Sequence, residues 1–201
     1  PRAGRYGLMS AQRVLHIISS TMRAGVAVMV MNLYRELDRE KIQFDFVAHQ
    51  LGDDDFGEEI GKLGGRVFRI PFLSEAGMSG FVRQVRVIIE THGPYAAVHA
   101  HTDYQSGFSA LAAKQAGVPI RICHAHSDTR AFRSPLFVLK KRLGRALIDR
   151  CATHRFACSQ SAGISTFGRR SMGHGRVTVI PNGIVLNGYR SEERRGGKEC
   201  R

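Results

Sequence analysis

The chain has 201 residues, of which 43% are hydrophobic, and it carries a formal net charge of +13 with a sequence pI near 10.4. That length allows one well-buried domain, and no stretch offers the roughly 20 apolar residues that a membrane-spanning helix needs. The charge favours polyanionic partners, namely nucleic acid, an anionic membrane surface or phosphate-bearing substrates, without choosing among them. The four cysteines form no Cys-x-x-Cys pair, so reduced thiols in a cytosolic protein are expected.

The predicted elements alternate between strand and helix. Residues 1–12 show no periodicity and are expected to be a disordered or vector-derived extension. A buried strand over 13–19 follows, then a loop through Gly25 and an amphipathic helix. Further strands are predicted over 44–48, 66–70, 96–101, 119–126, 155–159 and 176–180, separated by helices over 56–63, 80–91, 107–116, 135–153 and 161–167. This alternation predicts right-handed βαβ units and hence an α/β fold with a doubly wound parallel sheet.

Two of the predicted strands end in the pattern His-x-His, at His99–His101 and at His124–His126. Residues two apart on a strand face the same side, and ligands bind outside the carboxyl ends of parallel strands, so the four imidazoles predict one cleft. One histidine of each pair is expected to be buried and hydrogen-bonded, with His101 and His126 at the cleft. A metal centre is not predicted, because no carboxylate or cysteine stands at metal-motif spacing.

Two loops beside predicted strands could contact a ligand. The loop 19–25 precedes the first helix, whose free N–H groups can hold an anion, although the same loop would serve equally as an ordinary connection. With Gly25 as its only glycine, it is not a dinucleotide-binding fingerprint. Pro181 ends the last strand, and Asn182-Gly183 predicts a sharp turn after it.

The predicted helix 135–153 combines leucines with cations. Leucines three or four apart are expected to face the sheet, namely Leu136, Leu139, Leu143 and Leu147. Cations are expected to flank them, namely Lys140, Lys141, Arg142 and Arg145. A solvated basic face is the simpler interpretation, and peripheral contact of the segment 130–150 with an anionic membrane is the alternative. The cations are scattered and no zinc-finger, RNP or basic-zipper pattern occurs, so nucleic acid is not expected as a partner.

Taken in order, seven segments resemble the N-terminal half of a family 4 (group 1) glycosyltransferase, a retaining enzyme of GT-B fold. They are 14–18, Gly25 with 31–34, 41–46, 98–101, 124–127, 152–159 and 179–184. The resemblance implies a Rossmann-like acceptor-side domain over 13–184 and a truncated interdomain crossing within 185–201, whose polar end is expected to be non-native. It further implies no cofactor, a nucleotide-sugar donor, a saccharide or lipid-linked acceptor, and a cytoplasmic role in surface polysaccharide biosynthesis, peripheral at the inner membrane face.

The resemblance also implies roles for single residues. His126 corresponds to the strand-end histidine that lies near the transferred sugar, and it is the expected catalytic residue. The expected substrate-binding residues are Gly25, His101, His124, Ser127, Ser159, Asn182 and Gly183.

Departures from the family pattern bear on activity. The family's glycine loop usually has two glycines and then an acidic residue, where this sequence has Ala24-Gly25 and Ala27, and Val185 stands where an aspartate commonly follows. The paired glutamates of the C-terminal half are absent, so the chain alone is expected to be inactive, because cations that meet the leaving diphosphate would come mostly from that half. A half of a sugar-nucleotide 2-epimerase and a non-enzymatic basic domain that binds an anionic surface or nucleic acid are the alternatives.

Overall fold

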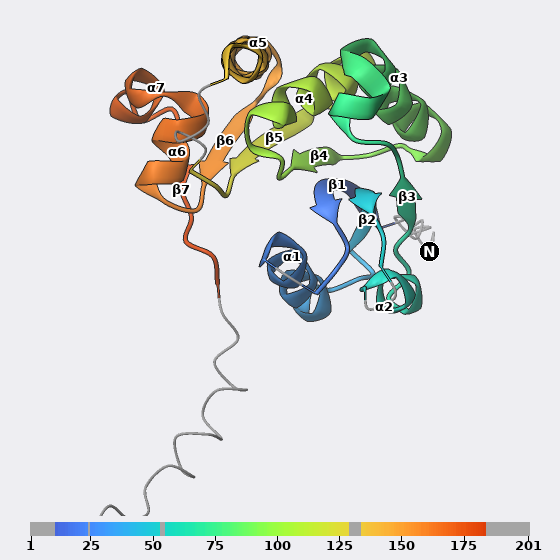
Figure 1. Cartoon of the computed structure of the whole chain (residues 1–201). Coiled ribbons are helices and arrows are strands. Elements are labelled where there is room, and N and C mark those ends of the chain that lie inside the picture. Colours follow the sequence, from blue (N-terminus) through green and yellow to red (C-terminus); the bar gives the residue numbers. More distant parts are fainter. Residues whose placement is uncertain (1–10, 24, 53–54, 129–133, 184–201) are drawn as a thin grey trace, which may run out of the picture.

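The computed structural model describes residues 11–23, 25–52, 55–128 and 134–183. At its centre lies a parallel seven-stranded sheet in the order β3-β2-β1-β4-β5-β6-β7 (Figure 1). The strands are β1 (Gln12–Ser20), β2 (Ile42–Gln50), β3 (Val67–Arg69), β4 (Ala97–Ala100), β5 (Ile120–Ala125), β6 (His154–Ala157) and β7 (Thr178–Val179). The predicted α/β fold with a doubly wound parallel sheet is confirmed. Of the predicted extension 1–12, residues 1–10 lie outside the described residues, and Gln12 is not part of an extension because it begins β1 and pairs with Ile42. The predicted crossing and tail over 185–201 also lie outside the described residues.

Helices cover both faces of the sheet. They are α1 (Gly25–Glu36), α2 (Gly57–Lys62), α3 (Leu73–His92), α4 (Ser106–Gln115), α5 (Pro135–Cys151), α6 (Gln160–Phe167) and α7 (Arg169–Gly173), with a 3-10 turn, η1, over Asp103–Gln105. Figure 1 shows α1 and α2 on the side of the sheet opposite α3, α4 and α5. None of the described helices is long and apolar enough to cross a bilayer.

Two helices differ from their predictions. The predicted helix 80–91 forms the second part of α3, which already begins at Leu73 and contains a break at Gly77, where φ is 68°. Glycine adopts this left-handed conformation without steric cost, so the chain continues as a second helical stretch beyond the break. The five-residue α7 was not predicted, because so short and polar a segment has no apolar periodicity.

The first strand shows how the sequence assigns its residues to the two faces. Leu15 and Ile17 are fully buried in the core under α3 and α4. Ile18 is buried in a second core with residues of α1 and β2, such as Val30 and Phe46. Side chains alternate along a strand, so His16 lies on the same face as Ile18, the face that α1 covers. Each such buried aliphatic side chain contributes about 1.5–3 kcal/mol to stability.

A buried carboxylate holds β2 to its neighbours. The Oδ2 atom of Asp45 accepts hydrogen bonds from Arg13 at 2.9 Å, Arg66 at 2.6 Å and the hydroxyl of Tyr95 at 2.8 Å. Burial alone would raise the pKa of Asp45, but these donors outweigh it and lower that pKa to about 2. The Asp45 carboxylate is therefore ionised throughout the neutral and mildly acidic range.

The orientation of α5 corrects its prediction. Leu136, Leu139 and Leu143 were expected to face the sheet, but 62%, 63% and 39% of their surfaces are exposed. The buried positions of this helix include Gly144 and Ile148 instead. Because α5 approaches α4 through Gly144, the leucines on the other side of the helix are turned towards solvent.

Replacing Gly144 with alanine is expected to lower the free energy of unfolding by about 3 kcal/mol, the upper end of the usual cost of overpacking. A Cβ atom at Gly144 would lie 2.3 Å from the carbonyl oxygen of Tyr104, a backbone atom that cannot move aside cheaply. The matched control is Gly61→Ala in α2, where nothing lies within 4 Å and alanine should gain up to about 1 kcal/mol. Urea unfolding measures both variants, and equal midpoints would show that the two helices do not touch here.

Candidate functional site

Five histidines from three neighbouring strands gather towards the carboxyl edge of the sheet, on its α1 face. His16 lies in β1, His99 in β4 and His124 in β5, and His101 and His126 directly follow β4 and β5. Pairing of β1 with β4 puts His16 opposite His99, and pairing of β4 with β5 brings the two His-x-His segments side by side. These five residues are called the histidine cluster below, and they include both pairs that the sequence placed at one cleft.

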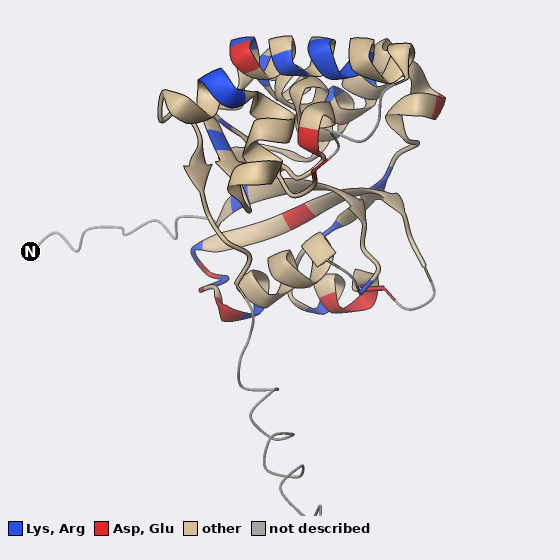
Figure 2. Ribbon diagram, turned by 60° about the vertical axis from the view of Figure 1, so that its left-hand side comes forward, with Lys and Arg blue, Asp and Glu red and all other residues tan. Residues whose placement is uncertain are grey.

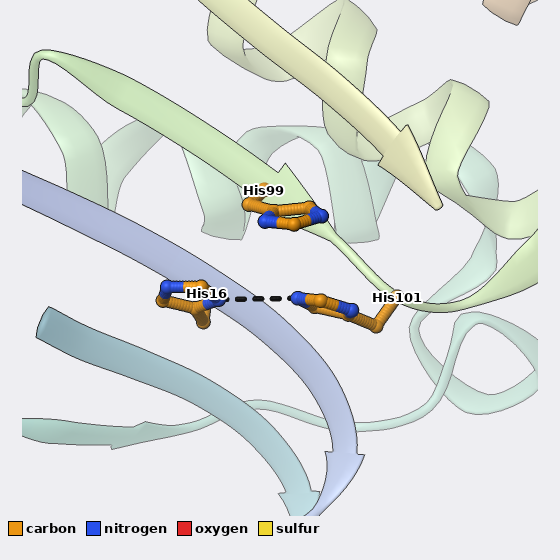
Figure 3. A group of neighbouring side chains, drawn as sticks. All are labelled: His16, His99 and His101. Atoms are coloured by element: carbon orange, nitrogen blue, oxygen red, sulfur yellow. Dashed lines mark hydrogen bonds between the residues drawn. The ribbon is translucent and has the colours of Figure 1, made fainter. Parts of the chain in front are cut away.

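Hydrogen bonds join the histidine cluster into two rows. In the longer row, His16 Nδ1 lies 3.1 Å from His101 Nε2 (Figure 3), and His101 Nδ1 lies 3.0 Å from His126 Nε2. In the shorter row, His99 Nε2 lies 3.2 Å from His124 Nδ1. These distances are ordinary for a ring N–H that donates to the bare nitrogen of the next ring.

Burial keeps these imidazoles neutral. It lowers the pKa of His16 to about 3 and, with a smaller effect of the neighbouring rings, that of His124 to about 3. Burial likewise lowers the pKa of His126 to about 4 and takes the pKa values of His99 and His101 well below the ordinary 6.5. At neutral pH each ring therefore carries one hydrogen and can donate one hydrogen bond and accept one.

The cluster brings nitrogens close enough for a metal ion, but neighbouring rings also stack on one another. Two groups of three ring nitrogens, one from each histidine, lie within 4.8 Å of one another. The first group comes from His16, His99 and His101, and the second from His101, His124 and His126. A metal accepts each lone pair in the plane of its ring. The ring of His99 lies over that of His101 (Figure 3), with centroids 4.0 Å apart and an angle of 31° between planes. Such stacking suits two hydrogen-bonded layers, and we assign no metal to the cluster.

Asp103 ties the ends of β4 and β5 together. Its Oδ1 atom accepts hydrogen bonds from the backbone N–H groups of His126 at 2.8 Å and Ser127 at 3.1 Å. Its φ of 50° lies in the left-handed region, which aspartate tolerates better than most residues. Burial raises the pKa of this carboxyl, while the two N–H donors oppose the shift. The Asp103 carboxylate thus fixes the main chain that carries His126.

Three hollows meet at His101. The largest has a volume of about 520 Å³, and its lining includes residues of α1, four histidines of the cluster, Phe156, Ile180 and Gly183. A second of about 270 Å³ lies at the carboxyl edge beside Asp103, His126 and Ser127, and a third lies along the loop that contains Gly25. The largest hollow, mostly apolar with a few convergent polar groups, has a size typical of small-molecule binding.

The structure brings most of the predicted site residues to these hollows. Gly25 begins α1 with φ of 43°, and a side chain there would meet nothing within 4 Å, so its backbone is open to a ligand. His124 is buried in the shorter row, and Ser127 is exposed next to Asp103. Gly183 lines the largest hollow, and the Asn182 side chain lies near enough to His126 to raise its pKa against the effect of burial.

Ser159 has a different position from the other predicted site residues. Its hydroxyl accepts a hydrogen bond from the backbone N–H of Ala162 at 3.2 Å and so caps the N-terminus of α6. The same hydroxyl lies 3.1 Å from that of Ser161. None of the hollows described above is lined by Ser159 within the described part of the chain, so capping is the role its contacts show.

Sequence reasoning missed two residues of this site. The apolar pattern of 13–19 places His16 in a strand and gives it no role in the site. The available signal is that an imidazole between buried aliphatic residues must find a hydrogen-bond partner. Asp103 follows the first His-x-His by two positions. Nothing local showed that its carboxylate would bind the main chain after the second one.

A doubly wound parallel sheet with ligand-sized hollows at its carboxyl edge is the Rossmann-like architecture of a GT-B half. The chain belongs to glycosyltransferase family 4, since residues 23–187 match the family described as Glycosyltransferase Family 4. It is 43% identical over 198 residues to EpsF of Bacillus subtilis (strain 168), a protein named as a glycosyltransferase. That match covers 94% of this chain and 51% of EpsF, so the chain spans about half the length of this relative.

Solved structures agree on the fold. Anabaena Alr3699/HepE, crystallised with UDP-glucose, superimposes with a TM-score of 0.62 at 19% identity, covering 92% of this chain and 50% of HepE. A Listeria monocytogenes protein named as a UDP-N-acetylglucosamine 2-epimerase gives a TM-score of 0.55 at 17% identity, covering 87% of this chain and 46% of that protein. At these identities the likeness establishes the fold, and the resemblance to a family 4 glycosyltransferase is confirmed by the sequence matches.

Proposed function

We propose that this chain is the N-terminal, acceptor-side half of a retaining glycosyltransferase that moves a sugar from a nucleotide-sugar donor to a saccharide or lipid-linked acceptor, in cytoplasmic synthesis of surface polysaccharide. Family membership and a relative of twice the length support the two-domain form. The UDP-glucose bound by HepE supports a nucleotide-sugar donor. The domain 13–184, with the crossing after it, follows from the same proposal.

The contact between the two strand-end histidines is the observation on which the proposal chiefly rests. His101 Nδ1 lies 3.0 Å from His126 Nε2. His101 lines both the hollow along the Gly25 loop and the hollow beside Asp103, and His126 lines the second of them. Free N–H groups at the start of α1 can meet phosphate oxygens, while His126 orients a sugar hydroxyl. The leaving diphosphate needs further cations, which the other half of the enzyme would supply, so the chain alone is inactive in this proposal.

A transfer assay tests the proposal. The two-domain protein, meaning this chain continued by its own C-terminal half, is incubated with UDP-sugars and candidate saccharide or lipid-linked acceptors. We expect release of UDP that depends on acceptor, with the anomeric configuration of the donor kept in the product, and no turnover by the 201-residue chain. Inversion of configuration would overturn the retaining mechanism, and turnover by the chain alone would overturn the need for the second half.

The same assay separates the alternatives. An epimerase would convert its sugar nucleotide without any acceptor. This alternative is tested because the Listeria protein named as an epimerase has a similar fold. A basic domain without enzymatic activity would show neither reaction, and it would bind RNA with a steep dependence on salt.

Contact of α5 with an anionic membrane is a further part of the proposal, because a lipid-linked acceptor would lie there. The exposed leucines Leu136 and Leu139 stand next to the cations Lys140 and Arg142. Figure 2 shows Lys and Arg recurring along the helices of this layer. Arg145 is excluded from the contact surface, because its guanidinium donates to the carbonyl of Thr166 at 2.8 Å. Residues 130–133 of the predicted membrane-contact segment 130–150 lie outside the residues that the structure describes.

The double variant Leu139→Ser/Arg142→Gln is expected to weaken binding to anionic lipid vesicles by about tenfold or more, since each cation near such a surface contributes about 1 kcal/mol and buried leucines add to it. Co-sedimentation with phosphatidylserine-containing vesicles measures this. The control Leu33→Ser removes a leucine that is 53% exposed on α1, on the other face of the sheet, and should leave binding intact. Equal binding by all three proteins would remove α5 from the membrane contact.

A further inference from the structure

We propose that His16 and His101 are positioning residues that fix His126 as the tautomer with its hydrogen on Nδ1. In this state His126 offers the cleft an N–H donor rather than an acceptor. The complementary ligand group is an oxygen with a free lone pair, such as a sugar hydroxyl or a phosphate oxygen. The tautomer follows from the contacts of this chain alone, whereas its use in sugar transfer rests on the proposed function.

The longer row allows only two arrangements of its hydrogens. Each neutral ring has one hydrogen, and His101 uses both of its nitrogens, one towards His16 and one towards His126. If His101 donates from Nδ1 to His126, its Nε2 must accept from Nδ1 of His16. In the reverse arrangement His126 donates inward from Nε2 and leaves Nδ1 bare. The rings therefore reverse together, and the two ends of the row decide between the arrangements.

The inner end favours hydrogens that point outward. His16 Nε2 is buried without a hydrogen-bond partner in the described part of the protein, and the His16 ring packs on Phe44, with centroids 4.2 Å apart. The outward arrangement leaves a bare lone pair at this position, whereas the inward arrangement leaves an N–H. Among backbone groups, a buried N–H without a hydrogen-bond partner is rarer in proteins than a buried acceptor without one. The same preference applied to this ring favours the bare lone pair at His16 Nε2.

The outer end favours the same direction. Asp103 holds its carboxylate against the backbone N–H groups of His126 and Ser127, and so fixes the main chain that carries the last ring of the row. Nδ1 of His126 is buried and forms no hydrogen bond of ordinary length among the described residues, but the Asn182 side chain lies near enough to raise the pKa of His126. A raised pKa is the effect of a group that accepts a hydrogen from the ring, so the Asn182 amide oxygen favours the outward hydrogen, and a ligand oxygen takes its place when Asn182 moves aside.

The consequence for recognition is a donor whose direction is fixed before the ligand arrives. A histidine without such neighbours would exchange between tautomers, and its ring would rotate. Fixing its tautomer and orientation when a ligand binds costs free energy, and a donor that is already fixed avoids this cost. The neighbouring pair His99 and His124 is bonded separately, and its rings stack on the longer row without joining it. This makes His99 a matched control position in the same cluster.

Ring ¹⁵N spectra of the histidine-labelled chain, and of the two-domain protein, test the tautomer directly, because protonated and bare ring nitrogens resonate far apart. We expect a hydrogen on Nδ1 in His16, His101 and His126. His101→Leu should release His126 into a mixture of tautomers. His101→Asn should retain the Nδ1 form, because an amide N–H can stand where Nδ1 of His101 donates, and His99→Leu should also retain it. A hydrogen on Nε2 of His126 in the unaltered chain would overturn the inference, even if His101→Leu failed to fold.

Transfer by the two-domain protein supplies the second readout. His101→Leu should lower kcat/KM by about tenfold or more, with most of the loss restored in His101→Asn. If the spectra show the expected tautomers but neither variant alters transfer, the positioning stands and the proposed role of His126 in the reaction fails. If the tautomer of His126 is unchanged in His101→Leu, the positioning role itself is wrong.

Discussion

The variant His126→Ala of the two-domain protein is expected to lose about a hundredfold in kcat/KM, the effect typical of removing one positioned hydrogen-bond donor from a desolvated site. His126 is held from two sides, by His101 at 3.0 Å from its ring and by Asp103 at 2.8 Å from its main-chain nitrogen. The alanine variant keeps the main-chain contact, so the fold should survive while the donor is lost. Initial rates with saturating acceptor measure the effect.

The control for this experiment is His154→Ala. His154 is exposed and begins β6, at the opposite edge of the sheet from His126. Its removal should leave transfer within about twofold of the unaltered protein, as for surface residues away from special contacts. Equal rates for His126→Ala and His154→Ala would show that His126 takes no part in the reaction.

The chain is expected to lose stability as the pH falls from 6.5 to about 3, and the loss begins well above the pH at which the Asp45 carboxylate is protonated. The unfolded chain binds protons on these histidines below pH 6.5, whereas burial lowers the pKa of folded His16 to about 3. Stability from such a ring is complete above pH 6.5 and falls as the pH drops, by about 2 kcal/mol per fully buried ring at pH 5. Asp45, with its pKa lowered to about 2, contributes a loss only below pH 3.8.

Urea unfolding at pH 7 and pH 5 measures this dependence. His16→Leu removes the proton-binding group and should flatten the change in unfolding free energy between the two pH values. The control His174→Leu replaces an exposed ring at the end of α7 and should leave the change as it is. An unaltered chain that is equally stable at both pH values would show that the cluster is not buried as the structure has it.

Most of the fold could be predicted because its signals are local. The apolar run in 13–19, and the Gly and Pro residues that separate the segments, are visible within a few residues of each element. The orientation of α5 could not be predicted in this way. It depends on Gly144 lying against Tyr104, a contact between helices that no local pattern encodes. The leucines that looked like a core face are exposed for this reason.

The site residues likewise fall into those that a local pattern shows and those that only strand pairing brings together. His-x-His at the ends of two strands is a local pattern, and it located His101 and His126 correctly beside each other. His16 is 85 positions from its partner His101, so only the pairing of β1 with β4 shows that they meet. The contact of Asp103 with the main chain of His126 likewise depends on how β4 lies beside β5.

The assignment of the carboxyl-edge cleft as the place where sugar is handled is tested most directly by the ring signals of His126 during a titration of the two-domain protein with its nucleotide-sugar donor. We expect the His126 signals to shift saturably, together with those of His101, while His154 at the opposite edge stays unchanged. Transfer that proceeds with the His126 signals unmoved at saturation would contradict the assignment and place the reaction elsewhere on the protein.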